Sequence, residues 1–126
     1  MHRVGVLIPL VAFLALCGCG SSTPDCSQIT YKVVPTTATA DHAAAPPANQ
    51  QKFSVAFDNV PEGCSVPQVV PQPNWFNLDP EHMSISSAKD ATNGLATCLA
   101  AKDGPILIAP KIGDGVTVAG GALTCK

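Results

Sequence analysis

Apolar and polar residues alternate in several short runs along the chain. The clearest run spans residues 52–57, where Phe53, Val55 and Phe57 fall on one face and the residues between them on the other. A period of two residues is typical of an antiparallel strand with one buried face. We therefore expect about seven short strands. The six further runs, apolar or alternating, cover residues 29–34, 74–78, 83–86, 95–99, 106–109 and 116–124.

The segments between these runs contain turn-forming residues and no helical pattern. Asp-Gly and Gly-rich sequences separate the last three runs, and three prolines interrupt residues 64–73. Residues 35–50 have no apolar period, and their prolines cannot donate to a strand ladder, so we expect an irregular edge or loop there. Many short strands predict an all-β sandwich, with the single tryptophan, Trp75, in the core between two sheets.

The first 18 residues have the pattern of a cleaved lipoprotein signal peptide. A basic start precedes an apolar run, residues 4–16, that is shorter than the roughly 20 residues needed to cross a bilayer. Leu16 and Gly18 precede Cys19 at a spacing that resembles the bacterial lipobox, so Cys19 is the predicted lipidated residue. Cys17 ranks second, because bulky Leu16 would then occupy the cleavage position. An ordinary secretory signal with two incidental cysteines is the alternative.

The rest of the chain divides into a tether and one domain. Residues 19–27 contain the lipidated cysteine and a flexible polar spacer, and residues 28–126 contain the strands. The membrane is the expected partner through the N-terminal lipid anchor. Gly20 is not the Asp that, by analogy with Gram-negative lipoproteins, retains such proteins at the inner membrane, so the outer membrane is the expected location.

The charged residues do not indicate a nucleic-acid partner. Only 13% of the 126 residues are charged, and the formal net charge of −2 becomes −3 when Arg3 leaves with the signal peptide. The lysines are spread singly, without a basic cluster or interleaved aromatic residues.

Four cysteines, Cys26, Cys64, Cys98 and Cys125, lie beyond the predicted anchor and admit three pairings. A zinc site is disfavoured because none lies in a C-x2-C pair and no histidine stands at ligand spacing. Disulfides suit a short exported chain. Successive antiparallel strands alternate direction, so the second strand ends where the first began. Cys64 follows the second strand and Cys26 precedes the first, so these two cysteines should lie together. The fifth and seventh strands end together by the same count, which pairs Cys98 with Cys125. Loops of these lengths are worth about 3 to 4 kcal/mol each in the chain-entropy model.

The order of several short motifs resembles a known family. Asn74-Trp75, Asp79-Pro80, the segment 94–97 (Gly-Leu-Ala-Thr) and the segment 104–109 (Gly-Pro-Ile-Leu-Ile-Ala) follow one another as in bacterial Ig-like domains of group 2. The form with paired cysteines is similar to modules on small acidobacterial-type lipoproteins. The resemblance covers roughly residues 29–126 and implies an Ig-like sandwich with an adhesion or scaffolding role. The sequence departs from the family at residues 76–78, where Phe-Asn-Leu replaces the usual serines, so one face is expected to be more apolar.

No residue pattern indicates catalysis, a cofactor or a metal. His42 lies in a segment rich in Pro and Ala, and His82 stands beside Met83, without the Cys-His-Met spacing of a copper site. The chain has no G-x-S-x-G motif and no calcium-loop spacing. Aspartates are common beside turns for backbone reasons alone, and five stand there: Asp58, Asp79, Asp90, Asp103 and Asp114.

The sequence therefore favours a non-catalytic cell-envelope lipoprotein whose Ig-like domain acts as a binding, adhesion or scaffolding module. An envelope protein or polysaccharide is the expected partner, and the Pro-rich segments 35–50 and 64–73 are the expected contact surfaces. One alternative is a passive surface spacer. The other is a periplasmic metal-binding protein or enzyme, which would need a pocket lined by His42, His82 and two or more of the aspartates.

Overall fold

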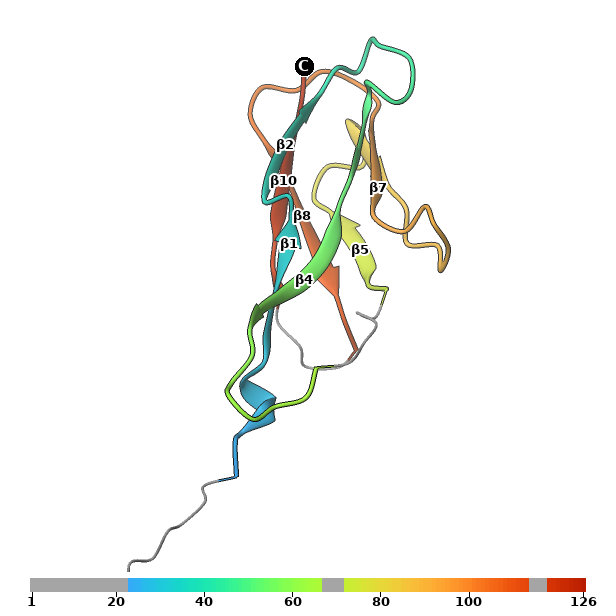
Figure 1. The fold of residues 1–126 in the computed structure, drawn as a ribbon. Coiled ribbons are helices and arrows are strands. Elements are labelled where there is room, and N and C mark those ends of the chain that lie inside the picture. Colours follow the sequence, from blue (N-terminus) through green and yellow to red (C-terminus); the bar gives the residue numbers. More distant parts are fainter. Residues whose placement is uncertain (1–22, 67–71, 114–117) are drawn as a thin grey trace, which may run out of the picture.

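The computed structural model describes residues 23–66, 72–113 and 118–126, and it is all-β (Figure 1). Within these ranges the one helical element is a 3₁₀ helix, η1 (Cys26–Gln28), and no helix is long and apolar enough to cross a membrane. The strands are β1 (Thr30–Val34), β2 (Thr37–Ala40), β3 (Gln50–Lys52), β4 (Ser54–Asn59), β5 (Asn74–Asn77), β6 (Met83–Ile85), β7 (Leu95–Cys98), β8 (Ile106–Lys111), β9 (Val118–Ala119) and β10 (Gly121–Cys125).

The strands form three hydrogen-bonded sheets with the orders β4-β1-β9, β3-β7-β6 and β2-β10-β8-β5. The first two sheets are linked through β3 and β4, which follow each other with only Phe53 between them. This arrangement is consistent with a β-sandwich. The beginning of the described chain and its C-terminus lie at opposite ends of the domain (Figure 1).

Each of the seven expected runs forms a strand. Three lengths of chain, which we call passes, are each divided into two strands: β1 and β2, β3 and β4, and β9 and β10. The pass from β1 to β2 changes sheet, because β1 pairs in parallel with β9 whereas β2 pairs in parallel with β10. The pass through β9 and β10 makes the same change at Gly120. Two residues of the last expected run, 116 and 117, lie outside the described residues.

The prediction that residues 35–50 are irregular was wrong in part. Residues 37–40 form β2, and Gln50 begins β3. The sequence Thr-Ala-Thr-Ala of β2 contains no large apolar side chain, so its strand character comes from its ladder with β10 and not from its own pattern. Residues 41–49 are a turn closed by backbone hydrogen bonds, among them the one from Asp41 N–H to the Ala48 carbonyl, 3.2 Å.

The core lies between the sheets and confirms the expected burial of Phe53, Val55 and Trp75. Phe57, expected on the same face, is only half-buried and packs against Tyr31, with 5.2 Å between the ring centroids. Phe53, Val55 and Trp75 are buried, whereas Lys52 and Ser54 are exposed. The other buried apolar side chains come from every sheet and include Val33, Met83, Ala96, Ile106, Ile108 and Leu123.

Gly94 is required where the turn before β7 crosses the β3–β4 pass. Its φ is +78°, and an added Cβ would stand 2.1 Å from the carbonyl oxygen of Phe53. Its own carbonyl accepts the Phe53 N–H at 2.8 Å. The absence of a side chain therefore lets two backbone segments meet beside the core.

We expect Gly94→Ala to lower the free energy of unfolding by more than about 3 kcal/mol, because a left-handed backbone cost of roughly 1–2 kcal/mol is added to a backbone clash. Urea denaturation followed by Trp75 fluorescence measures this. Gly104→Ala is the matched control, since Gly104 has φ +83° but open space around the added Cβ. Equal losses in the two variants would contradict the close approach.

Candidate functional site

The indole of Trp75 is held by a buried asparagine. Trp75 Nε1 donates to Asn93 Oδ1 at 2.9 Å. The Asn93 amide nitrogen donates to the carbonyls of Pro73 (3.0 Å) and Ala88 (2.8 Å), which fixes the entry to β5 and the loop before β7 against each other. Asn93 is only 6% exposed and is the one buried polar residue among those described. Its three hydrogen bonds compensate its burial.

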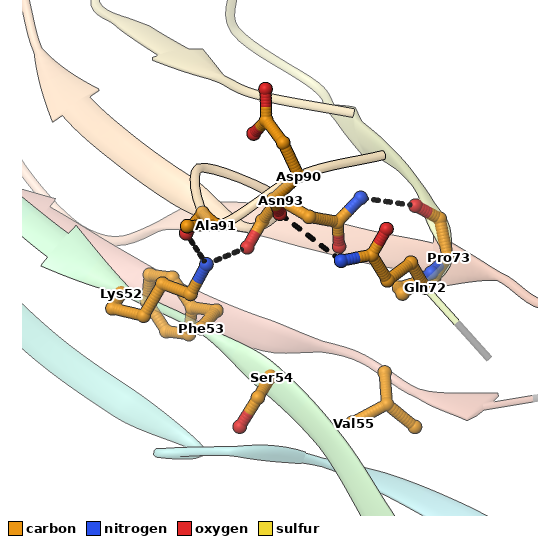
Figure 2. Close-up of a pocket in the computed structure, with 9 residues that line it drawn as sticks. All are labelled: Lys52, Phe53, Ser54, Val55, Gln72, Pro73, Asp90, Ala91 and Asn93. Carbon is orange, nitrogen blue, oxygen red and sulfur yellow. Dashed lines mark hydrogen bonds between the residues drawn. The ribbon is translucent and has the colours of Figure 1, made fainter. Parts of the chain in front are cut away.

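A pocket of about 240 Å³ opens beside this asparagine (Figure 2). Lys52 Nζ enters it and donates to the carbonyl oxygens of Ala91, at 2.7 Å, and Asn93. Gln72 Nε2 donates to the Asp90 carbonyl at 3.0 Å. The polar groups of the pocket thus bind one another, so its geometry supports a structural role for the loop and does not indicate a ligand.

A second hollow, of about 420 Å³, is apolar and lies on the outward face of the sheet β2-β10-β8-β5. None of the described residues that line it is charged. Small residues form the floor of this hollow. At Gly120 no side chain can be accommodated, because an added Cβ would stand only 2.6 Å from the Ile108 carbonyl oxygen. The lining residues are Thr36, Leu78, Leu107, Ile108, Ala109, Gly120, Gly121 and Ala122.

Large apolar side chains project from the same face. Phe76 pairs with Ala109 and Leu107 pairs with Ala122 in the ladder, so the members of each pair share one face of the sheet. Phe76 is 55% exposed, Leu107 54% and Leu78 77%. The outward face of an antiparallel sheet is normally polar, and a contiguous apolar patch is typical of an interaction site. We name Phe76, Leu78, Leu107, Ala109 and Ala122, together with Gly120, the apolar face.

One edge of the same sheet, strand β5, is closed to strand pairing at Trp75. The Trp75 N–H donates to Ser87 Oγ at 2.7 Å, and the Ser87 hydroxyl donates back to the Trp75 carbonyl at 3.3 Å. A side chain therefore occupies the ladder groups that β5 would offer to another strand.

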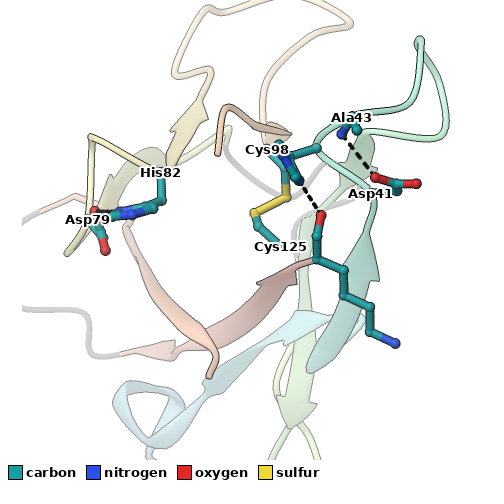
Figure 3. The surroundings of a disulfide bond; sticks show 8 residues. Asp41, Ala43, Asp79, His82, Cys98 and Cys125 are labelled. Atoms are coloured by element: carbon teal, nitrogen blue, oxygen red, sulfur yellow. Dashed lines mark hydrogen bonds and ion pairs between the residues drawn. A yellow bond between two sulfur atoms is a disulfide. The ribbon is translucent and has the colours of Figure 1, made fainter. Parts of the chain in front are cut away.

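The structure contains the two disulfides that the strand count predicts, Cys26–Cys64 and Cys98–Cys125. The first joins η1 to the turn after β4. The second joins the last residue of β7 to the last residue of β10, and both of its cysteines are buried (Figure 3). It therefore links two sheets through the core. Cys17 and Cys19 lie outside the described residues.

An ionic cluster lies near the buried disulfide (Figure 3). Asp79 accepts from His82 Nδ1 at 2.7 Å, and Lys102 Nζ contacts its other carboxylate oxygen. The Asp79 side chain is only 14% exposed. Hydrogen bonding to Lys102, and secondly to His82, lowers the pKa of Asp79 from its ordinary 3.8 to about 2. The cluster ties the turn after β5 to the segment between β7 and β8.

The other histidine and aspartates are dispersed. His42 bonds to the Lys126 carbonyl through its backbone N–H and its Nδ1, whereas His82 bonds to Asp79. Asp58 stands 3.5 Å from Lys32, and hydrogen bonds from Thr92 lower the pKa of Asp90. Across residues 23–66, 72–113 and 118–126, no three His, Cys, Asp or Glu side chains form a group that could hold a metal ion. Asp114 lies outside these ranges.

The apolar face was not among the surfaces expected from the sequence. The segment 35–50 includes a strand and a turn of mostly small residues, and residues 67–71 of the other segment lie outside the described part. The signal for it was the departure at residues 76–78, from which one face was expected to be more apolar: Phe76 and Asn77 end β5, and Leu78 directly follows that strand. Alternation alone did not reveal which face was outward.

Comparison with protein-family models gave no match, and a search of the curated proteins gave none either.

Asp79→Asn should lower the free energy of unfolding at pH 5 to 7 and have progressively less effect toward pH 2. The folded-state pKa of Asp79 is below 3.8, so its carboxylate stabilises the fold above pH 3.8 and loses this contribution as pH falls through about 2. Urea denaturation at several pH values tests this. Asp58→Asn is the control, because its ion pair with Lys32 is exposed and should contribute little. A deficit for Asp79→Asn that is the same at pH 2 and pH 6 would contradict the prediction.

Proposed function

We propose that this chain is a non-catalytic cell-envelope lipoprotein whose Ig-like domain is a binding or scaffolding module. The apolar face carries this proposal. A small domain that leaves Phe76, Leu78 and Leu107 exposed together on a sheet face loses hydrophobic stabilisation that burial would supply, at about 25 cal/mol per Å². Such a face is typical of a surface that is covered by a partner.

The order of strands supports an Ig-like domain. Counted as seven passes from A to G, the passes neighbour each other as G-A-B-E-D in one layer (β9, β1, β4 with β3, β7, β6) and as A-G-F-C in the other (β2, β10, β8, β5). An Ig constant-type sandwich has A-B-E-D and C-F-G sheets, with a buried tryptophan on strand C, where Trp75 lies here. The disulfides differ from the B–F bridge of antibody domains.

The proposed anchor and the position of the domain are compatible. Cys19 precedes Cys26 by seven residues, which reach at most about 25 Å when extended. Cys26 begins η1 and is bound to Cys64, and η1, the coiled ribbon in Figure 1, lies at the end of the domain opposite the C-terminus. An anchored domain would therefore stand close to the membrane on its Cys26–Cys64 end, with the apolar face along its side. We infer attachment to the outer membrane from Gly20.

The rival proposals need features of other kinds. A passive spacer needs no apolar face, and its outward sheet could be polar throughout. A metal carrier or enzyme built on the two histidines would need them in one pocket, but the described structure gives His42 and His82 different hydrogen-bond partners.

Cys19→Ser should abolish incorporation of a fatty-acid analogue into the full chain expressed in a Gram-negative bacterium, because the lipidated thiol is removed. Cys17→Ser is the matched control and should retain the label. Label that persists in Cys19→Ser but is lost in Cys17→Ser would move the acceptor to Cys17, and label that persists in both would contradict the anchor.

A lipid-free chain of residues 20–126, which includes all ten strands and both disulfides, should capture a component of envelope extract from cells that express the full protein. Leu107→Glu should reduce capture at least about tenfold, because a charge would be buried without a partner. The control Ser84→Glu places the same charge at an exposed position of β6, in the sheet β3-β7-β6, and this variant should capture the component normally.

The other outcomes separate the rivals. Capture that is unaffected by Leu107→Glu but lost when residues 42–48 are shortened would move the binding surface to that turn. No capture by any form would favour the spacer, and a metal ion bound at stoichiometric occupancy would contradict the non-catalytic binding module.

A further inference from the structure

The apolar face presents both a projection and a hollow. Phe76 and Leu78 project at the β5 side of the sheet, whereas small residues form the floor of the hollow beside them: Ala109 on β8, Ala122 on β10, and Gly120, which directly precedes β10. Leu78 and Leu107 also line this hollow. Leu107, on β8, stands between the two parts. The hollow of about 420 Å³ has room for a large apolar side chain such as the exposed ones on the same face.

This arrangement is complementary to itself. A two-fold axis parallel to β8 and lying between two facing copies would reverse the order of strands across the interface. The β5 side of each copy would then face the β10 side of the other, so Phe76 and Leu78 would lie over the hollow of the partner. A two-fold interface requires one patch to be complementary to itself in this way. Leu107 would lie close to the axis and meet Leu107 of the second copy.

Charge does not oppose the pairing at its centre. The described residues that line the hollow are all uncharged, although the chain as a whole carries a formal net charge of −2. Lys111, the exposed charge at the end of β8, is not among the residues of the hollow, but it shares the outward face with Leu107 and would also meet Lys111 of the second copy near the axis, so like charges at this end of the interface weaken the pairing. An uncharged face on an acidic protein is better suited to a copy of itself than to a charged ligand.

The size of the face indicates a weak association. Four strands at a spacing of about 4.8 Å, with up to about six residues at 3.3 Å each, cover roughly 400 Å² per copy. Stable interfaces bury about 800 Å² per partner, so free copies would pair only at high concentration. Attachment to one membrane surface would raise the effective concentration of the copies.

We propose that the apolar face binds a second copy of this chain through a two-fold interface in which Phe76 and Leu78 of each copy fill the hollow formed by Ala109, Gly120 and Ala122 of the other. The inference rests on the proposed function, because it names the partner of the same face and uses the proposed anchor to make a weak contact sufficient.

Photo-cross-linking of the full chain in cells tests this pairing. A photoreactive amino acid replaces Leu78 in a copy with one tag, and a copy with a second tag is coexpressed. We expect an adduct of twice the chain's mass that contains both tags, with the cross-link in the segment 118–126 of the second copy, which includes Gly120 and Ala122. The control carries the same photoreactive residue at Ser84, an exposed position of β6 in the sheet β3-β7-β6, and should give no such adduct.

A charge exchange at Leu107 separates the interface from folding. Two copies with Leu107→Glu should give at least about tenfold less adduct, and so should two copies with Leu107→Lys, because like charges meet at the axis. Coexpression of Leu107→Glu with Leu107→Lys should restore it. Leu107 is exposed, so each variant should unfold at the same urea concentration as the unaltered chain.

The outcomes distinguish this inference from the proposed function. An adduct that joins Leu78 to a different envelope protein, and is lost with Leu107→Glu, would overturn the second copy as partner but retain the binding module. The absence of any Leu78 adduct would overturn both. A double-tag adduct that is equally abundant with two Leu107→Glu copies would overturn the interface.

Discussion

The buried hydrogen bond between Trp75 and Asn93 is the constraint on which the arrangement of the sheet β2-β10-β8-β5 depends. Trp75 is the largest side chain of the core, and its indole N–H would lose its water partner on burial. Asn93 supplies the acceptor, and its amide group holds the backbone at Pro73 and Ala88 in turn. The side chain that fills the core therefore also positions the strand that carries Phe76. Removing either partner would leave a buried polar group unpaired, which costs about 1–3 kcal/mol.

Close backbone contacts make this arrangement possible. Gly94 lets the turn before β7 touch Phe53, and Gly120 lets the last pass of the chain change sheets beside Ile108. At both positions a side chain would strike a carbonyl oxygen. The close approach of Gly120 to Ile108 also shapes the surface. Because Gly120 has no side chain, a hollow remains on the outward face of the sheet.

Several polar side chains of the described structure are bound within the fold, whereas three large apolar side chains of one sheet face stay exposed. Lys52, Asp79 and Ser87 are each bound to nearby groups, and the pocket beside Asn93 is closed by its own hydrogen bonds. By contrast, Phe76, Leu78 and Leu107 are more than half exposed. The bound polar groups and the exposed apolar ones together favour a surface that associates through hydrophobic contact. The two disulfides stabilise the domain that carries this surface.

The strand runs, the burial of Trp75 and the pairing of the cysteines could be predicted from the sequence alone. Alternation along 52–57 is a local property, and the disulfide pairing needed only the number and direction of the strands. The tertiary structure decided the rest. Strand β2 exists because β10 lies beside it, Asp79 meets Lys102 from 23 residues away, and the apolar face joins β5, β8 and β10. A local signal at residues 76–78 indicated an apolar face, but no local signal gives these contacts, because each depends on which strands become neighbours when the sheets close.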